Sequence, residues 1–509
     1  MTRVLVVGAG PTGLALGLQA HALGAAVRVI DRRTEAARPS RAMMLHARSL
    51  EVLRPLGVVD SLLRYADSAP TVRLHLRGRV LPVRIAELAV PDTAYPHLTL
   101  LPQARVESVL ATALESRGVP IERGVELASL RSARRRGVQV QLRGRGEATC
   151  DYLVGCDGAD STVRQAVGIG TSGGVYDREI VQADLELDGG LGADTAHVST
   201  TRAGLIFLFP HGDQAAWRLL ATRPVGGGPM SPRDVQEMFD AARLQTRVSR
   251  VAWSEIVPMR HRLADRYRDD RVFLAGDAAH VHSPAGGQGM NTGIQDAINL
   301  GWKLAQAAYA TDPETLLDSY ELERRPVARA TTAWTNLVFW AESGLDPIAA
   351  LIRTFLLPVG APLVVPAVLR RRHLTAAGFR ILAQLRVAYP SSRLSIDDGR
   401  PDSLPLRVGD RLPDLPVAVA DGSTRLQTLT AQPGTHLLLL RDAPTVEVDD
   451  TSIHVHRLLD RGGRGLVAVR PDGYVGLRTT EASSPQVAHW LSSTGASPTP
   501  AVLRRRGPR

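Results

Sequence analysis

The chain has 509 residues, of which 44% are apolar and 22% charged, and it carries a net charge of +10. These proportions are ordinary for folded soluble proteins and exclude wholesale disorder. Lys303 is the one lysine, so arginine supplies almost all of the positive charge, which first suggests a nucleic-acid binder. However, the clusters at 134–136, 370–372 and 504–506 fall in a predicted turn, a helix end and a tail rather than along one stripe. We therefore expect no nucleic-acid partner and attribute the arginine excess to the codon usage of a GC-rich genome.

Cysteine content and hydropathy indicate a reduced, cytoplasmic protein. Cys150 and Cys156 are too few for a disulfide framework or a four-cysteine metal site. The N-terminus lacks the basic region and cleavage site of a signal peptide. The most apolar later stretch, 355–369, has 15 residues and three prolines, which predicts a segment too short to span a bilayer.

The first elements in chain order alternate between strand and helix. A β-branched run at 3–7 precedes a glycine-rich turn, a helix at 14–23 and a second strand at 27–30. A helix at 103–115 and a strand at 151–155 continue the rhythm. This pattern predicts an α/β fold in which helices cover a parallel sheet.

Two strand-rich stretches interrupt that rhythm and give the fold a partly α+β character. Residues 73–99 alternate around Arg77-Gly78, which is typical of a hairpin, and residues 175–260 are also strand-rich. We expect both to form one inserted sheet. Beyond residue 340 the sequence predicts helices broken by prolines, a polar linker at 391–405, and then short strands of a separate small domain.

The first motif with a chemical meaning is the Gly8–Gly13 turn, which has the form GxGxxG. Gly8 permits the tight turn, Gly10 lets the backbone approach a pyrophosphate, and Gly13 allows close packing of helix and strand. Pro11 and Thr12 lie within the turn, at the start of the helix whose amide groups attract an anion. Asp31 ends the second strand, where its carboxylate can accept hydrogen bonds from an adenosine ribose. The motif predicts a dinucleotide site without separating NAD from FAD. A second match at 168–173 follows a helix instead of a strand, so we do not interpret it as a nucleotide site.

Two later motifs point to a flavin. Asp157-Gly158 ends a predicted strand, and Gly276-Asp277 ends another. An aspartate at a strand end can bind a ribityl chain, and the glycine-rich loop after Asp277 leads into a helix at 292–303 whose N–H groups can face the flavin ring. The loop residues expected to border the ring are Pro284, Gly286, Gly287, Gly289, Met290 and Asn291.

Together these motifs resemble, in type and order, the single-component FAD-dependent aromatic hydroxylases, whose archetype is para-hydroxybenzoate hydroxylase. The segments at 39–51 and 101–107 are also similar to that family, so the resemblance covers about residues 1–340. Within it, the aromatic polyketide hydroxylases are the most similar branch. The blocks at 407–413 and 469–475 look like that branch's C-terminal thioredoxin-like domain. Because no cysteine follows residue 156, we expect that domain to be structural.

The resemblance implies a role for each motif residue. Asp31, where the family usually has Glu, would bind the ribose; Arg41 and Gln103 the pyrophosphate and ribityl region; Asp157 and Gly158 the diphosphate side; and Asp277 the ribityl hydroxyls. The full set of expected cofactor-binding residues is Gly8, Gly10, Pro11, Thr12, Gly13, Asp31, Arg32, Arg41, Gln103, Asp157, Gly158, Asp277, Pro284, Gly286, Gly287, Gly289, Met290 and Asn291. No protein nucleophile and no metal are expected, and Pro284 and Gly286 would border the reacting side of the flavin.

The same resemblance, together with the pattern of strands and helices, predicts the domain boundaries. A discontinuous Rossmann-like FAD-binding domain would comprise 1–72, 100–174 and 262–340, with a substrate-binding β-sheet domain of 73–99 and 175–261 inserted. A helical connector (341–395), a thioredoxin-like domain without redox cysteines (396–498) and a disordered tail (499–509) would follow.

Several side chains invite a functional interpretation and also have an ordinary one. His280 and His282 are spaced i, i+2 in a loop, unlike a helical zinc pair, which favours a positioning role. Phe207, Phe209 and Trp217 could line an aromatic substrate pocket or fill a core. Arg260 could contact an acidic substrate or form a surface ion pair.

The resemblance implies a flavin-dependent monooxygenase that consumes NADPH or NADH and O₂. It would hydroxylate a polycyclic phenolic, polyketide-like substrate through a C4a-hydroperoxyflavin, in antibiotic or secondary-metabolite biosynthesis, as a monomer or homodimer. Three alternatives stay open: Baeyer–Villiger oxygenation of a related polyketide, hydroxylative inactivation of an antibiotic, and a flavin-fold binding protein without redox activity.

Overall fold

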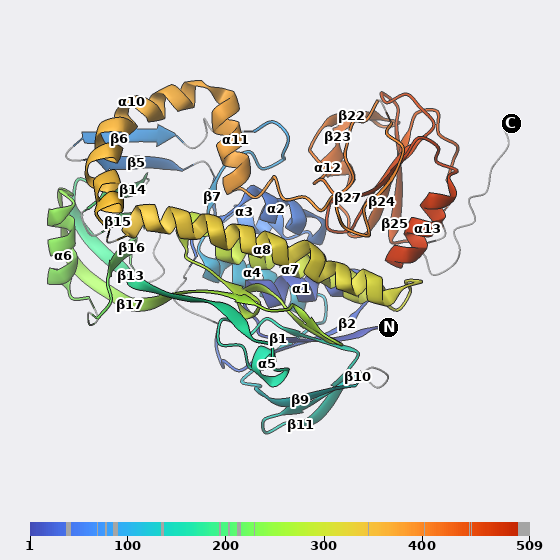
Figure 1. The fold of residues 1–509 in the computed structure, drawn as a ribbon, viewed down its shortest axis with the longest axis horizontal. Helices are drawn as coiled ribbons and strands as arrows, with labels where there is room; N and C mark the ends of the chain where they lie inside the picture. The colour runs from blue at the N-terminus through green and yellow to red at the C-terminus, as the bar shows by residue number, and fades with distance from the viewer. Residues whose placement is uncertain are drawn as a thin grey trace.

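The structure is a computed structural model. It describes residues 1–36, 42–68, 70–76, 79–84, 90–133, 137–192, 195–201, 204–210, 215–226, 228, 230–344, 346–401, 403–446, 448 and 450–496. The 31-residue helix α8 (Pro313–Ser343) crosses the centre of the molecule, and the larger sheets lie around it (Figure 1). Four sites predicted from the sequence lie outside the described residues: Arg41, the hairpin turn Arg77-Gly78, the cluster at 134–136 and the tail at 499–509.

A six-stranded sheet contains the N-terminal strands. β1 (Arg3–Val7) pairs in parallel with both β2 (Ala26–Asp31) and β12 (Tyr152–Gly155), and four of its five residues are buried, as expected for a strand covered on both faces. The remaining strands extend the sheet in the order β18-β19-β12-β1-β2-β8: β8 (Ile121–Arg123), β19 (Val272–Leu274) and the antiparallel edge strand β18 (Arg268–Asp269).

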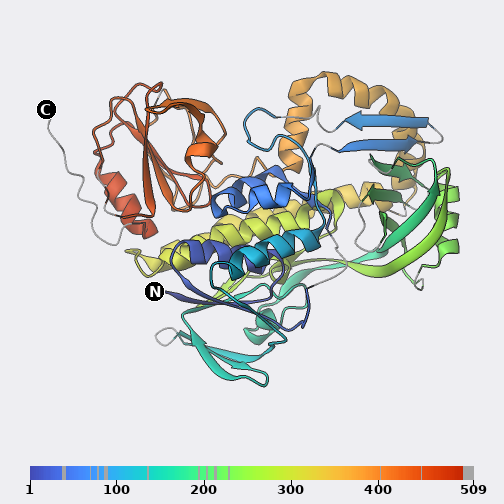
Figure 2. The ribbon, with the colours of Figure 1, turned by 180° about the vertical axis from the view of Figure 1, so that it is seen from behind.

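Helices α1 (Pro11–Ala22), α4 (Gln103–Glu115) and α7 (Gln288–Gln306) pack together beside this sheet (Figure 2). The prediction of an α/β fold with a parallel, helix-covered sheet is thereby confirmed. Smaller elements complete this region: α2 (Ala47–Leu53), α3 (Val59–Leu63), α5 (Thr162–Ala166), β3 (Met44–Leu45), β4 (Asp67–Ser68), β7 (Thr99–Leu100), β9 (Leu127–Ala133), β10 (Gly137–Leu142) and β11 (Gly146–Cys150).

An eight-stranded sheet forms the second region and joins the two strand-rich stretches. β14 (Thr195–Thr200) pairs in parallel with β5 (Thr71–Leu76), which links the early hairpin to the later strands. The 19-residue strands β13 (Thr171–Gly189) and β17 (Thr246–Ala264) pair along their lengths and connect this sheet to the first region. The other elements are β6 (Arg79–Arg84), β15 (Leu205–Pro210), β16 (Trp217–Pro224), β20 (His280–Val281) and α6 (Pro232–Ala241).

A helical arch follows α8. α9 (Pro347–Leu351), a π-helical turn (Ile352–Leu356) and α10 (Leu357–Arg370) run on without interruption, and α11 (Arg372–Leu382) returns toward the centre. The expected proline breaks were wrong at two positions: Pro362 and Pro366 lie inside α10, while Pro358 lies in its first turn, directly after the π turn, where a proline costs no helix hydrogen bond.

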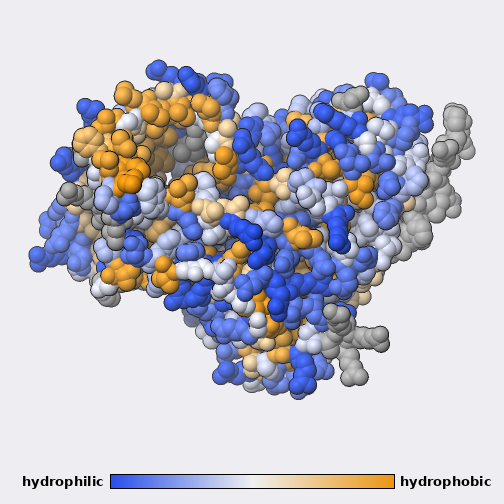
Figure 3. All heavy atoms as spheres, viewed as in Figure 1, coloured by the Kyte–Doolittle hydropathy of each residue, from blue (hydrophilic) through white to orange (hydrophobic). Residues whose placement is uncertain are grey.

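The arch is therefore longer than the 15-residue stretch predicted from the sequence. Its helical segment Pro347–Arg370 has 24 residues and, by length and composition alone, is apolar enough to cross a membrane, with 22% of its apolar window buried. Phe355, Val359 and Leu363 are among its exposed apolar side chains. Figure 3 shows a largely hydrophobic surface at the upper left, where Figure 1 places α10.

The C-terminal region is a five-stranded sheet in the order β21-β27-β26-β24-β25. Its first strand, β21 (Ile396–Asp398), comes from the stretch expected to be a linker. The other elements are β22 (Pro416–Val419), β23 (Gly422–Arg425), α12 (Leu426–Leu429), β24 (Thr435–Leu440), β25 (Ile453–Leu458), β26 (Leu466–Val469), β27 (Val475–Thr479) and α13 (Pro485–Thr494). That this region is thioredoxin-like stays a prediction.

Candidate functional site

A cavity of about 910 Å³ runs from the glycine turn after β1 to the eight-stranded sheet. Both sheets, the loop before α7, and α8 contribute to its wall. Most of the residues predicted to bind a cofactor line it: Gly8, Gly10, Pro11, Thr12, Asp31, Arg32, Gln103, Asp157, Gly158, Asp277, Pro284, Gly286, Gly287, Gly289 and Met290. Thus segments as far apart as Gly8 and Met290 meet around one space.

At the β1 end, the glycine turn has the geometry that a phosphate site needs. Gly8 has φ +109°, and a Cβ there would lie 2.3 Å from the carbonyl oxygen of Cys156. A Cβ on Gly13 would lie 1.9 Å from the Gly8 carbonyl oxygen, so Gly13 serves helix–strand packing and does not line the cavity. A Cβ on Gly10 would meet no atom within 4 Å. The start of α1 has neither a side-chain cap nor an acidic residue, which leaves its N–H groups open to an anion.

Asp31 lies at the C-terminal end of β2, as predicted. Its Oδ2 accepts a hydrogen bond from the Ala9 N–H (2.8 Å), and its Oδ1 accepts one from the Arg33 N–H (2.8 Å). The Arg33 guanidinium binds both oxygens. Burial raises the pKa of Asp31, but these hydrogen bonds outweigh burial and lower the pKa overall. The carboxylate is therefore charged, and a ribose that binds it must displace Arg33, whose side chain is 41% exposed.

The Asp157-Gly158 loop holds the start of α5. Asp157 Oδ1 accepts a hydrogen bond from Ser161 Oγ (2.5 Å), and its Oδ2 accepts one from the Val163 N–H (3.1 Å). Burial raises the pKa of Asp157, and these hydrogen bonds oppose the rise. Gly158 has φ +85° and open space beside its Cα, so its backbone borders the cavity without hindrance.

The loop before α7 is shaped by two adjacent glycines with positive φ, Gly286 (+68°) and Gly287 (+64°). A Cβ on Gly286 would lie 2.9 Å from the Trp334 ring, and one on Gly287 would lie 2.9 Å from Met44. His46 Nε2 lies 2.9 Å from the Gly286 carbonyl oxygen, and burial lowers the pKa of His46 to about 4. The loop thus presents its backbone and the N-terminus of α7 to the cavity in one fixed form.

Two predicted residues of this loop region differ in their surroundings. Asp277 is exposed to the cavity. Asn291 is fully buried and does not line it. Its amide donates hydrogen bonds to the carbonyls of Met44 and Gly287 and accepts one from the His46 N–H, so it ties the loop to the β3 segment.

These observations test whether the residues fit FAD. An elongated cavity, an uncapped helix N-terminus, open space beside Gly10 and Gly158, and a charged carboxylate at the end of β2 match the pyrophosphate and ribose of a dinucleotide. The fixed loop before α7 matches the polar edge of an isoalloxazine ring. The donor set therefore fits FAD.

The other end of the cavity is aromatic and apolar. Phe207 and Phe209 both line it, with ring centroids 6.3 Å apart and ring planes inclined by 4°. Trp217 does not reach the cavity: it is 4% exposed and packs beside the His197 ring in the core under α6. Alternation along a strand explains the difference, because adjacent positions point to opposite faces.

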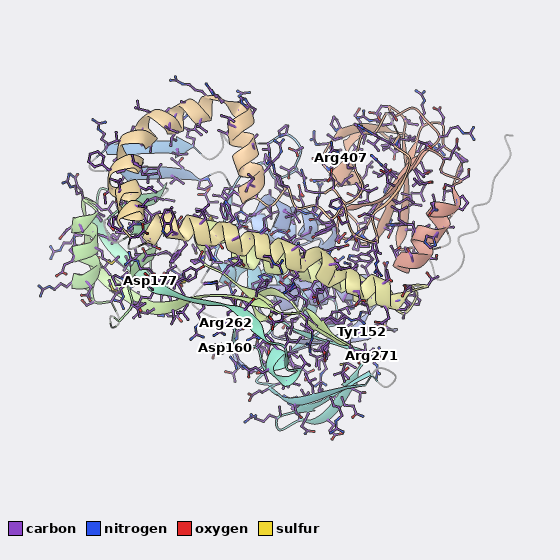
Figure 4. All side chains as sticks on the ribbon, in the orientation of Figure 1. Tyr152, Asp160, Asp177, Arg262, Arg271 and Arg407 are labelled. Carbon is purple, nitrogen blue, oxygen red and sulfur yellow. The ribbon has the colours of Figure 1, made fainter. Side chains whose placement is uncertain are left out.

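Arg260 lines the cavity beside the Asp157-Gly158 loop. Its guanidinium lies 3.7 Å from Asp160, and that of Arg262 lies 3.3 Å from the same carboxylate. Figure 4 labels Arg262 and Asp160, which face each other where β17 passes α5. Two arginines share one exposed carboxylate at this edge, which leaves positive charge beside the cavity.

Sequence reasoning missed several wall residues: Arg33, Met43, Met44, Glu255, Phe339, Glu342 and Leu382. For the last three no local signal existed, because a helix position that faces a cavity has the same pattern as one that faces a core. Glu342 is the notable one: burial raises the pKa of its carboxyl to about 7.

Comparison with known proteins agrees with this geometry. The model of a family described as FAD binding domain matches residues 1–335. The 6-methylpretetramide 4-monooxygenase of Streptomyces rimosus is 36% identical over 411 residues, which cover 78% of this chain and 72% of that protein. The chain belongs to this FAD-binding family and is a flavin-dependent monooxygenase.

Solved structures support the same assignment. The anhydrotetracycline hydroxylase of Streptomyces rimosus superposes with a TM-score of 0.75 at 28% identity, over 98% of this chain and all of that chain. An aklavinone-11 hydroxylase in complex with FAD and aklavinone superposes with a TM-score of 0.73 at 26% identity, over 97% of this chain and 99% of that chain. The cofactor is FAD, and the reaction class uses NAD(P)H and O₂.

Proposed function

We propose that this monooxygenase hydroxylates a flat polycyclic phenol of the aromatic polyketide kind. The observation that carries the proposal is the continuity of the cavity from the loop before α7 to the parallel rings of Phe207 and Phe209. Two nearly parallel rings favour a planar substrate. The names of the relatives and solved structures, which include a 6-methylpretetramide 4-monooxygenase, an anhydrotetracycline hydroxylase and an aklavinone-11 hydroxylase, support the same substrate class.

Bound FAD supplies the oxygen-transfer chemistry. The chain's own residues bind it, orient the substrate and exclude water. Pro284 and Gly286 border the cavity at the α7 loop, which His46 and Asn291 hold in place. Phe339 packs against Ala285, Ile180 and Met259 and closes the wall with apolar atoms. Such a wall is needed because water at the reacting centre diverts the reaction toward peroxide release.

The assignment of FAD binding and substrate binding to separate regions is also a proposal. The FAD-binding part would be 1–72, 100–174 and 262–340, the substrate part 73–99 and 175–261, and the arch and C-terminal region the remainder. We propose a cytoplasmic enzyme that works as a monomer or homodimer in secondary metabolism. NADPH and NADH are both admissible reductants.

One experiment tests the reaction. The purified, FAD-loaded protein is screened against polycyclic phenols for stimulated NAD(P)H oxidation, and products are analysed after reaction in labelled oxygen. We expect one labelled oxygen atom in a new phenolic hydroxyl. A labelled lactone would show Baeyer–Villiger insertion instead, and failure of NAD(P)H to bleach the flavin with every phenol would contradict the monooxygenase activity.

A further inference from the structure

Glu342 is an acidic residue in the substrate end of the cavity. It lies in the last turn of α8, three residues beyond Phe339, which is about one helical turn. Phe339 packs against Ala285 in the loop before α7. Thr222 on β16 and Leu205 on β15 line the same part of the wall. A Cβ on Gly204 would lie 1.9 Å from Thr222 Oγ1 and 3.5 Å from the Glu342 carbonyl oxygen, so these two residues are close neighbours.

Within the described part of the chain, the Glu342 carboxylate has no hydrogen bond or ion pair, and the residue is partly exposed to the cavity. Cations are nevertheless close. Arg178 Nε donates to the Ser343 carbonyl oxygen (2.7 Å), and Arg353 donates to the carbonyl oxygens of Ala341 (3.3 Å) and Gly344 (2.8 Å). Both arginines are buried. They bind the backbone on each side of Glu342 and hold the helix end in place, while its carboxylate stays available.

Two independent features make this arrangement costly without a ligand. An ionised carboxylate at a helix C-terminus faces the negative end of the helix dipole, and its removal from water is unfavourable unless it is paired. Thr222 Oγ1 is a second polar atom at this place, buried and without a partner among the described residues. Gly204 covers Thr222 Oγ1, so Glu342 is the group that can meet a ligand directly, and an unpaired polar group on a cavity wall is typical of a ligand site.

We propose that the carboxylate of Glu342 binds a hydrogen-bond donor at the outer end of the substrate, either a ring hydroxyl or a protonated amine. This contact selects and orients polycyclic molecules that carry such a donor at the edge remote from the reacting carbon. The inference rests on the proposed function, because it assumes that the substrate occupies the cavity beside Phe207 and Phe209.

The charge of Glu342 makes the contact depend on pH. Burial raises the pKa of this carboxyl to about 7, so it is largely neutral at pH 6 and largely ionised at pH 8. The charged groups on the elements packed around it are Arg178 on β13, Arg353 in the π turn, Glu255 on β17 and Asp346 before α9. Asp346 accepts hydrogen bonds from Trp340 Nε1 and from the N–H groups at the start of α9. The two arginines bind backbone carbonyls as described, and Glu255 has a partner of its own. Affinity for a donor should therefore rise between pH 6 and pH 8.

The test measures binding to the FAD-loaded full chain through quenching of flavin fluorescence. The probes are anhydrotetracycline, which has ring hydroxyls and a dimethylamino group, and aklavinone, which has ring hydroxyls and no amine. The variants are E342L and E342Q, and the control is E237Q, at an exposed glutamate of α6 that pairs with Arg233. At pH 8 we expect E342L to raise the Kd of anhydrotetracycline about 10- to 100-fold, the range of a hydrogen bond to a charged group. E237Q should match the wild type.

The pattern of loss identifies the donor. If the donor is a hydroxyl, both probes lose affinity in E342L and the amide of E342Q restores part of it. If the donor is an ammonium group, anhydrotetracycline alone loses affinity and E342Q restores none. In both cases the wild type binds more tightly at pH 8 than at pH 6, and the variants lose this difference.

Two results would overturn the inference, and they differ in meaning. Wild-type affinity for both probes in E342L, with the pH dependence retained, would show that Glu342 has no ligand role while the proposed function stands. No binding of either probe to the wild-type holoenzyme would remove the proposed substrate class, and the inference with it.

Discussion

Two of the glutamates of helix α8, Glu323 and Glu342, lie 19 residues apart and have opposite surroundings. Glu323 is 3% exposed and accepts hydrogen bonds from Arg470 (2.7 Å to each oxygen), Lys303 Nζ (2.8 Å), Asn299 Nδ2 (2.7 Å) and Ser392 Oγ (2.5 Å). Glu342 lines the cavity and has none of these contacts. Burial raises the pKa of both carboxyls. At Glu323 the charges of Arg470 and Lys303 outweigh burial and hold the pKa below its usual range, whereas at Glu342 the pKa stays raised at about 7.

The comparison distinguishes two uses of buried charge. The Glu323 cluster joins α8, α7 and the C-terminal sheet, because Arg470 also binds Asp472, and Asp472 in turn accepts from Asn299. Every member has a partner, which is the pattern of a structural network. The Glu342 site has an unpaired acid that lines the cavity, which is the pattern of a binding site. We infer that the C-terminal region serves to support α7 and α8.

The largest effect is expected from breaking the paired cluster. Arg470→Ala leaves Glu323 and Asp472 buried without their main cation, which should lower the free energy of unfolding by about 3–5 kcal/mol in urea titrations. Arg464→Ala, at an exposed arginine that pairs with Glu481, is the matched control and should cost less than about 0.5 kcal/mol. A cost below about 1 kcal/mol for Arg470→Ala would contradict the structural role of the network.

The next effect concerns the cofactor end of the cavity. Gly10→Val places a side chain in open space, so the apoprotein should unfold as the wild type does while its affinity for FAD falls at least about 100-fold, on the order of 3 kcal/mol. Gly13→Val collides with the backbone of Gly8 and should destabilise the fold itself. FAD titration together with thermal unfolding separates the two results, and unchanged FAD affinity in Gly10→Val would argue against the pyrophosphate site.

A smaller effect is expected on the pH dependence of stability when Glu342, the unpaired glutamate, is replaced. The pKa of Glu342 in the fold is about 7, above its ordinary value of 4.5, so ionisation destabilises the native state progressively as pH rises from about 4.5 through 7. Glu342→Gln removes that cost. The variant should match the wild type near pH 4.5 and exceed it by about 1–2 kcal/mol at pH 8, a value reduced for exposure to the cavity. Equal stability at both pH values would show that the carboxylate is paired.

The smallest effect is expected at the aromatic wall. Phe207→Leu keeps an apolar surface and loses the flat face, so the Kd of aklavinone should rise about 3- to 10-fold, or roughly 1 kcal/mol. Trp217→Phe is the control within the same sheet: it should lower stability through core packing and leave the Kd unchanged. If Trp217→Phe raised the Kd of aklavinone and Phe207→Leu left it unchanged, the substrate would bind elsewhere.

Local motifs were predictable because their causes are local. The helix expected at 103–115 has those bounds. The glycine turn lies where expected after β1 but is shorter, because α1 begins at Pro11 and ends at Ala22, instead of the predicted 14–23. A tight turn needs glycine whatever the rest of the chain does, and hydrophobic periodicity follows from which face is buried. The match at 168–173 follows α5 and leads into β13, so it lacks the strand-turn-helix setting, as the sequence indicated.

Long-range features were not predictable from the same patterns. Helix α10 continues through Pro362 and Pro366, although each proline by itself predicts the end of a helix. Lys303, the one lysine, is fully buried, and burial lowers its pKa to about 8. Its role depends on Glu323 and Arg470, which lie 20 and 167 residues away.

The sequence by itself determined the nucleotide-binding turn, the order of the flavin motifs and hence the class of chemistry, because backbone geometry at glycines and strand ends depends on few neighbouring residues. Only the tertiary structure decided which charges are paired. It places Glu323 against the C-terminal sheet and Glu342 against open space on one continuous helix, where the sequence shows two similar residues. Pairing depends on what approaches each side chain through space, and that is set by how distant segments pack.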